Sequence, residues 1–228
     1  MSDVRLFFPK IKSMTILGLS TFRFRVLAML AVMSALAMVM SVIRLVVTSN
    51  PFHVYLGWNL FLGWIPIGLA LLAERRINNQ WKILIISALW LLFFPNSPYI
   101  ITDLIHLRPG NYALFWHDAI MIFTYAMVSL ACGLISLYWM QKVWTKAFSA
   151  RISFVLLLAV FPLTGYGVYL GRVQRWNSWD LFVHPKKLLI NALLSFHSTT
   201  AWVITIEFAI LMAVMYLFLL SVLSMKRD

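Results

Sequence analysis

Six long apolar runs constrain this chain more than any other feature of its sequence. They lie at residues 26–48, 56–73, 83–107, 114–140, 152–170 and 201–225. A bilayer core of about 30 Å requires about 20 apolar residues in a helix. Apolar residues make up 62% of the 228 residues and charged residues only 11%, which excludes an ordinary soluble domain. The pattern predicts an all-α, polytopic integral membrane protein with about six transmembrane helices.

The third run is interrupted between Pro95 and Pro98. Two prolines remove two backbone donors and disfavour helix in the residue before each, so the helix must stop or kink. About 13 residues precede this break, or about 20 Å of helix, which is too short to cross the bilayer. Ser97 as N-cap and Pro98 at the first helical position predict a new helix over about 98–107. That helix is either the second half of a broken span or a helix lying in the interface.

The chain divides into a basic N-terminal segment, residues 1–25, and a single transmembrane helical domain, residues 26–228. The segment is expected to be cytoplasmic or interfacial. Because the run 26–48 is much longer than the apolar core of a signal peptide, it is interpreted as an uncleaved anchor. Cys132 is the only cysteine, which excludes an internal disulfide.

The basic residues predict the orientation of the spans. The chain has 19 Lys and Arg against 7 Asp and Glu, and a net charge of +12 at pH 7. Thirteen of the bases lie near the N-terminus, after the second and fourth spans and at the C-terminus, and six lie on the other side. By the positive-inside rule, both termini are cytoplasmic and the protein lies in the cell inner (plasma) membrane. Nucleic-acid binding is not expected, because the bases are divided between two membrane faces.

Two acid and histidine pairs lie at the outer ends of the spans. Asp103 precedes His106 by three residues on one helix face, a spacing at which a carboxylate orients an imidazole. His117 and Asp118 lie just inside the fourth span. We expect these four residues to perform acid–base chemistry. The alternative for the first pair is a polar stripe that meets lipid headgroups.

Asp118 requires a partner, because an unpaired ion at that depth costs several kcal/mol. Arg108, Arg172 and His106 are the expected partners. The alternative role of Asp118 is a structural ion pair between the fourth and fifth spans.

Arg172 and Arg175 lie on the outer side, against the positive-inside tendency. A guanidinium presents two parallel donors to a phosphate or a carboxylate, so we expect these residues to hold an anionic group. Ordinary phospholipid at the interface would also satisfy them. The other residues expected to bind substrate are Asn59, Asn96, Asn177 and Asp180.

Glu207 lies about two turns into the last span and is expected to be a buried ionisable residue. It would carry a proton or pair with a base from another span, and the alternative is a protonated side chain bonded to a neighbouring helix. No cofactor is expected. A divalent metal stays an alternative, because the outer side offers nitrogen and oxygen donors, but no motif of fixed spacing such as HExxH joins them. These donors are Asp103, His106, His117, Asp118, Asp180, His184 and His197.

Three sequence blocks resemble an uncharacterised prokaryotic integral-membrane family, domain of unknown function 1361 (DUF1361). They are WNLFLGWIP at 58–66, FPNSPYIITDLIHL at 94–107 and the Gly171–Asp180 block with Arg172, Arg175 and WNSWD. The resemblance covers about residues 56–211. It implies a polytopic bacterial membrane protein without an assigned activity, and it transfers no catalytic residues. Its blocks coincide with the outer polar ends described above.

These observations predict a multi-pass membrane protein with an outward-facing polar site. That site would bind or modify a lipid-linked or anionic envelope substrate, such as a phosphate-bearing lipid, and its other partners would be membrane lipids. Whether the protein is an enzyme stays open. The alternatives are a small transporter or channel, for which a broken span could face an anion, and a non-enzymatic membrane assembly or accessory subunit.

Overall fold

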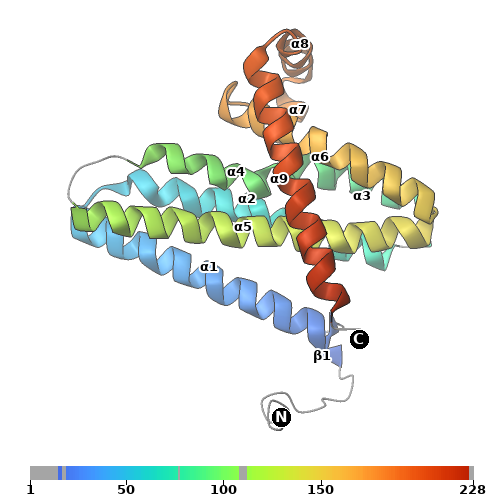
Figure 1. Ribbon diagram of the computed structural model, residues 1–228, viewed down its shortest axis with the longest axis horizontal. Helices are drawn as coiled ribbons and strands as arrows, with labels where there is room; N and C mark the ends of the chain where they lie inside the picture. Colours follow the sequence, from blue (N-terminus) through green and yellow to red (C-terminus); the bar gives the residue numbers. More distant parts are fainter. Residues whose placement is uncertain (1–14, 17–18, 77, 108–111, 226–228) are drawn as a thin grey trace.

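The computed structural model describes residues 15–16, 19–76, 78–107 and 112–225, and nearly all of them are helical (Figure 1). A two-stranded antiparallel ladder pairs Thr15 with Ser20 and Ile16 with Leu19. The elements are β1 (Thr15–Ile16), β2 (Leu19–Ser20), α1 (Thr21–Thr48), η2 (Pro51–Val54), α2 (Tyr55–Arg75), α3 (Gln80–Phe93), α4 (Asn96–Tyr99), η3 (Ile100–His106), α5 (Tyr112–Ala147), α6 (Ala150–Arg172), α7 (Asp180–Val183), α8 (Pro185–Ser195) and α9 (Thr199–Ser224). The elements η2 and η3 are 3₁₀ helices.

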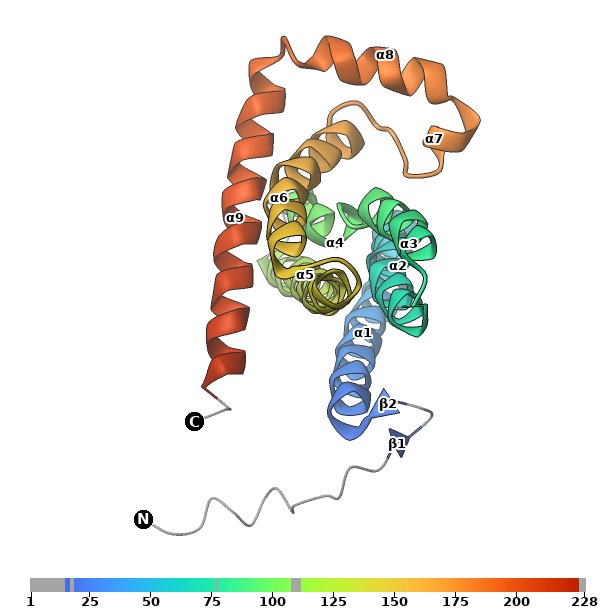
Figure 2. The same ribbon diagram turned by 90° about the vertical axis from the view of Figure 1, so that its right-hand side faces the viewer.

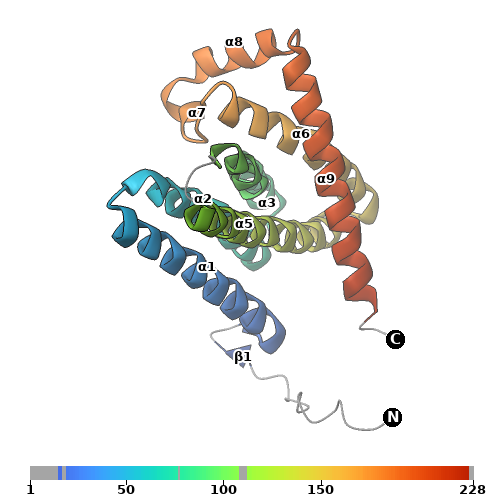
Figure 3. The same cartoon turned by 60° about the vertical axis from the view of Figure 1, so that its left-hand side comes forward.

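Six helical segments in the described part of the chain are long and apolar enough to cross a membrane. They are α1, α2, the combined segment Gln80–His106, α5, α6 and α9. This confirms the predicted membrane helical class. Figures 1 and 3 show that α1 begins and α9 ends at the same end of the molecule.

Two names are used below for the ends of this bundle. The site end is formed by Thr48, Tyr55, His106, Tyr112 and Arg172. The opposite end is formed by Thr21, Arg75, Ala147, Ala150 and Ser224.

Helix α5 is the centre of the bundle and contacts α1, α2, α4, α6 and η3. In its most apolar stretch 67% of the residues are buried inside the protein, compared with 17% in α1 and in α9. Figure 2 shows α1 and α9 at the periphery, with α4 between α6 and the pair α2 and α3. The most peripheral helices therefore present most of their apolar surface outward, as lipid-facing helices do.

The first helix begins at Thr21, before the end of the basic segment 1–25. Arg23 and Arg25 therefore belong to α1. Of residues 1–20, the structure describes 15–16 and 19–20.

The interruption at Pro95 is a change of winding within one continuous helical path. Helix α3 ends at Phe93, and α4 begins at Asn96 and runs directly into η3. The predicted N-cap at Ser97 is wrong: Ser97 lies inside α4, and its hydroxyl donates to the Gly63 carbonyl at 3.4 Å. Pro98 is tolerated because it lies in the first turn, where no backbone donor is required. The residues after the break pack inside the bundle, against α5 and α2.

Three glycines make room for the break. A Cβ on Gly133 of α5 would lie 2.6 Å from Ser97 Cβ, and one on Gly167 of α6 would lie 2.5 Å from Pro95 Cγ. A Cβ on Gly171 would lie 3.2 Å from the Tyr99 ring. Small residues at membrane helix interfaces let backbones approach closely. The broken segment can therefore sit between α5 and α6 only because these positions carry no side chain.

Replacing Gly167 with alanine is expected to destabilise the protein. Overpacking costs about 1–3 kcal/mol, because the added methyl meets the rigid Pro95 ring. Gly68→Ala is the matched control, since a Cβ there meets nothing within 4 Å, and alanine should stabilise that helix by up to about 1 kcal/mol. Thermal unfolding in one detergent, followed by circular dichroism, measures both. A Gly167→Ala protein that melts no lower than Gly68→Ala would contradict this role.

Candidate functional site

The 3₁₀ winding of η3 determines which side chains face the interior at the site end. This helix runs over seven residues, and such runs are uncommon beyond three or four. Because residues three apart eclipse one another in a 3₁₀ helix, Ile100, Asp103 and His106 lie along one line. Asp103 is completely buried and His106 lies at the end of that line.

Arg172, the last residue of α6, binds this segment through most of its side chain. Its Nη2 donates to Asp103 Oδ1 at 2.5 Å and its Nε donates to Thr102 Oγ1 at 2.6 Å. Its Nη1 lies 3.4 Å from His106 Nε2, and its Cζ lies 4.9 Å from the centre of the Tyr99 ring. A guanidinium only donates, so the contact with His106 is a hydrogen bond when Nε2 carries no proton.

Helix α2 supplies the second partner of Asp103. Asn59 Nδ2 donates to Asp103 Oδ2 at 3.2 Å, so both carboxylate oxygens have partners. The Tyr55 ring meets His106 edge-on, with ring centres 6.0 Å apart. We call Asn59, Tyr99, Thr102, Asp103, His106 and Arg172 the Arg172 cluster. It joins α2, the broken segment and α6 at one point.

A cavity of about 590 Å³ lies beside the Arg172 cluster. Six residues expected to act at the site line it: Asn59, Asn96, His106, Arg172, Arg175 and Asn177. Aromatic side chains of Trp58, Tyr99 and Trp176 and several leucines complete the wall. Asp103 is not among the lining residues. The cavity therefore meets the guanidinium and the imidazole, with the carboxylate behind them.

The loop after α6 closes this cavity. Asn96 Nδ2 donates to Ser178 Oγ at 3.0 Å, and Ser178 Oγ donates to the Leu92 carbonyl at 3.0 Å. The Asn177 backbone N–H donates to Asp180 Oδ2 at 2.7 Å. Asn96 and Asp180 thus shape the loop, and Asp180 does not line the cavity.

Arg175 lies at the tip of this loop with a positive φ of 60°. Its side chain is exposed on the cavity wall. Within the described residues no carboxylate forms an ion pair with it. Arg175 therefore brings an uncompensated positive charge to the cavity.

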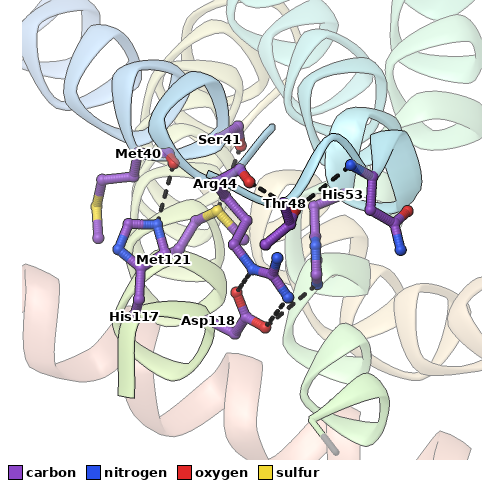
Figure 4. A network of polar contacts seen from close by, with 9 residues as sticks. Met40, Ser41, Arg44, Thr48, His53, His117, Asp118 and Met121 are labelled. Atoms are coloured by element: carbon purple, nitrogen blue, oxygen red, sulfur yellow. Dashed lines mark hydrogen bonds and ion pairs between the residues drawn. The ribbon is translucent and has the colours of Figure 1, made fainter. Parts of the chain in front are cut away.

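Asp118 belongs to a separate cluster, shown in Figure 4. Its two oxygens accept from Arg44 Nε at 2.6 Å and from Arg44 Nη2 at 3.0 Å. His53 Nε2 lies 4.0 Å from Asp118 Oδ2. We call Arg44, His53 and Asp118 the Arg44 cluster. It fastens α1 and η2 to α5.

Two of the three expected partners of Asp118, Arg172 and His106, were therefore wrong. Arg172 and His106 belong to the Arg172 cluster, and Arg108 lies outside the described residues. The ion pair joins the first and fourth spans, and not the fourth and fifth. Arg44 was missed, although it is the only charged residue in the apolar run 26–48. A lone charge within a membrane span requires a partner, so the position of Arg44 alone could have identified it as a candidate partner for Asp118.

His117 lies next to Asp118 in the sequence but makes a different contact. Its Nε2 is 3.1 Å from the Met40 carbonyl on α1, while Asp118 turns to Arg44 (Figure 4). Adjacent helical residues point about 100° apart, which explains the divergence. The four residues expected to act together are thus separated: Asp103 and His106 belong to the Arg172 cluster, Asp118 belongs to the Arg44 cluster, and His117 contacts the backbone of α1.

His53 is the member of the Arg44 cluster that comes from the short helix η2. Burial lowers its pKa below the ordinary value, and Arg44 acts in the same direction, while Asp118 opposes both. His106 and His117 also act on it electrostatically. With a lowered pKa the imidazole is neutral at pH 7, so Asp118 is compensated mainly by Arg44.

The expectation that Glu207 is buried was wrong. Its side chain is exposed, and in the part of the chain that the structure describes it has no ion-pair partner. Helix α9 packs on α6 through the face that carries Ala201, Thr205, Met212 and Tyr216. Glu207 follows Thr205 by two residues, about 200° around the helix, and so faces away.

No group of three or more His, Cys, Asp or Glu side chains within the described ranges could hold a metal ion. His184 and His197 lie apart from both clusters, in the segment that carries α7 and α8. The polar groups at the site end are instead used in ion pairs and hydrogen bonds.

The comparison with protein families identifies this chain. A family described as "Protein of unknown function (DUF1361)" matches residues 58–215, well over half of the sequence, and the chain belongs to it. No curated protein and no solved structure matches the chain. The matched region contains the whole Arg172 cluster and the cavity, whereas Arg44 and His53 lie before it.

Asp103→Asn is expected to lower the stability of the protein strongly. Removing one partner of a buried ion pair costs about 3–5 kcal/mol, and the lower end applies because Arg172 is partly exposed. Removing the second charge as well, in Asp103→Asn with Arg172→Gln, should recover part of the loss. Thermal unfolding of the two single variants and the double variant measures this coupling. Losses that simply add would contradict it, and Asp180→Asn is the control for a carboxylate outside the pair.

Proposed function

We propose that this DUF1361 protein binds the acidic head of a lipid-linked or other anionic envelope substrate in the cavity at the site end. The observation that carries the proposal is Arg175, a guanidinium on the cavity wall without a carboxylate partner among the described residues. Within the described part of the chain, the residues that line the cavity include no Asp or Glu. Because Asp103 offsets the charge of Arg172, the positive potential of the cavity comes from Arg175. A bidentate guanidinium suits a phosphate or a carboxylate.

The dimensions and walls of the cavity suit such a ligand. Its volume of about 590 Å³ falls within the range of about 300–1,000 Å³ for small-molecule sites. Leu62, Leu92 and Leu188 supply an apolar side, while Asn59 and Asn177 supply hydrogen-bonding groups. A headgroup attached to a lipid presents the same combination of charge, polar groups and apolar stem.

We assign the proton-transfer role at this site to His106. It lines the cavity, and its Nε2 faces Arg172, which would also hold the substrate's anion. Asp103 is buried behind it and acts as a positioning residue for Arg172. Because His117 and Asp118 contact α1, we assign them to holding α1 against α5. Proton transfer by His106 would serve hydrolysis or group transfer on the bound lipid.

The proposed orientation places both termini in the cytoplasm and the cavity at the outer face of the cell inner (plasma) membrane. The distribution of bases supports it, because the opposite end carries bases at the ends of α2, α3, α5 and α6 and in the turn after α2, namely Arg75, Arg76, Lys82, Lys146 and Arg151. Positive residues favour the cytoplasmic side.

The transporter and accessory-subunit alternatives lack a specific supporting observation. A transporter requires a polar path through the middle of the bundle. Trp90, Phe94 and Met140 lie in the core there and are completely buried. This apolar packing favours a site that opens at one end.

Arg175→Gln is expected to impair the function in the cell. A strain lacking the gene should show a change in one envelope lipid class, and the wild-type gene should reverse it. Loss of a charged hydrogen bond of about 1.5–3 kcal/mol would weaken substrate binding at least about ten-fold, so Arg175→Gln should reverse the change poorly. Arg151→Gln, an exposed arginine at the opposite end, is the matched control.

Lipid analysis of the four strains measures this result. Full restoration by Arg175→Gln would overturn the proposal. So would an unchanged lipid composition in the strain that lacks the gene.

The orientation is tested by labelling single cysteines in intact cells. In a Cys132→Ser background, Val183→Cys in α7 should react with a membrane-impermeant maleimide, because its side chain is exposed near the cavity. Ala150→Cys, exposed at the opposite end, should react only after the cells are opened. The reverse pattern would place the cavity in the cytoplasm.

A further inference from the structure

A second cavity, of about 570 Å³, lies at the opposite end of the bundle. Its lining residues come from α1, α2, α5 and α9. It shares no lining residue with the first cavity. What it binds is therefore independent of the function proposed above.

Among the described residues that line this second cavity, one is acidic, Glu74, and it is already paired. Arg23 of α1 donates through both terminal nitrogens to the two oxygens of Glu74 of α2, with Nη2 and Oε1 at 2.9 Å. The Arg23 Cζ also lies 5.4 Å from the centre of the Trp139 ring. This pair is electrically neutral and holds α1 to α2.

Two lysines of α5 add charge that this pair does not compensate. Lys142 and Lys146 are exposed, and neither forms an ion pair with a carboxylate of the described chain. They are four residues apart, a spacing at which like charges on a helix repel each other. Lys142 Nζ lies 4.1 Å from the centre of the Tyr138 ring, which directs its charge toward the cavity wall. Three bases against one acid leave two positive charges in excess.

The remaining walls indicate the kind of anion. Leu220 and Leu223 of α9 form an apolar side, and Gln141 and Thr145 add polar groups. Basic pockets between transmembrane helices bind anionic lipid headgroups. We propose that this cavity binds the phosphate headgroup of an anionic phospholipid from the leaflet at the opposite end. Free phosphate shares the ionic chemistry, but it would make no use of the apolar side.

Native mass spectrometry of the full chain in detergent tests this site. The probes are phosphatidylglycerol, zwitterionic phosphatidylcholine and inorganic phosphate. The test variant is Lys142→Gln with Lys146→Gln, and the matched control is Arg75→Gln with Lys82→Gln. The control removes two exposed bases from the same end, outside the cavity lining.

The wild-type protein should retain phosphatidylglycerol in preference to phosphatidylcholine. Each lysine near anionic lipid contributes about five-fold in affinity, so the test variant should bind phosphatidylglycerol about thirty-fold more weakly, with a much smaller loss in the control. Glu74→Gln should act in the opposite direction and tighten binding, because it removes the one negative charge among the described lining residues.

Equal binding of phosphatidylglycerol by the wild type and the test variant would overturn the proposal. So would equal losses in the test variant and the control, since that result assigns the effect to net charge alone. Displacement of the lipid by inorganic phosphate, with no preference for phosphatidylglycerol over phosphatidylcholine, would overturn the assignment to a lipid. A thermal unfolding measurement on each variant distinguishes lost binding from lost folding.

Discussion

The ion pair between Asp103 and Arg172 is the interaction on which the site end depends. A completely buried carboxylate is stable only when its charge is paired and its oxygens are hydrogen-bonded. Arg172 and Asn59 meet that requirement, and in doing so they fix the end of α6 and the start of α2 to η3. The same contacts leave one side of Arg172 and the ring of His106 on the cavity wall. The same ion pair therefore stabilises the fold and places Arg172 and His106 on the cavity wall.

This arrangement requires the third span to change its winding without leaving the bundle. A regular α-helix would place Asp103 and His106 farther apart around the axis, whereas the 3₁₀ turn aligns them. The break can pack closely because Gly133 and Gly167 leave space for Ser97 and Pro95. The prolines at the break thus set the geometry of the site. The glycines on α5 and α6 leave the space into which the break packs.

The sequence predicted the spans well, because burial in a bilayer depends on long apolar runs that need no knowledge of contacts. It also identified Arg172, Arg175 and His106 as candidates, and they meet at one cavity. Which acid pairs with which base was harder to predict from the sequence. Asp118 lies beside Arg44, 74 residues earlier in the chain, and hydrophobicity does not encode which spans are neighbours. Glu207 was assigned to the interior because a strongly apolar helix has no polar face that would reveal its orientation.

The pairing of the acids explains why the excess of bases points to anionic ligands. Among the described residues, Glu74, Asp103 and Asp118 are each bound to an arginine, and Asp180 accepts from the loop backbone. The acids near the two cavities are therefore committed to holding the helices together. Arg175 at one end and Lys142 with Lys146 at the other are left without such partners, each beside a cavity. Charges at a membrane surface that the chain itself does not neutralise are neutralised by lipid or by substrate. Among the described residues that line the two cavities, an imidazole is present at the site end, that of His106, and the proposed proton transfer depends on it.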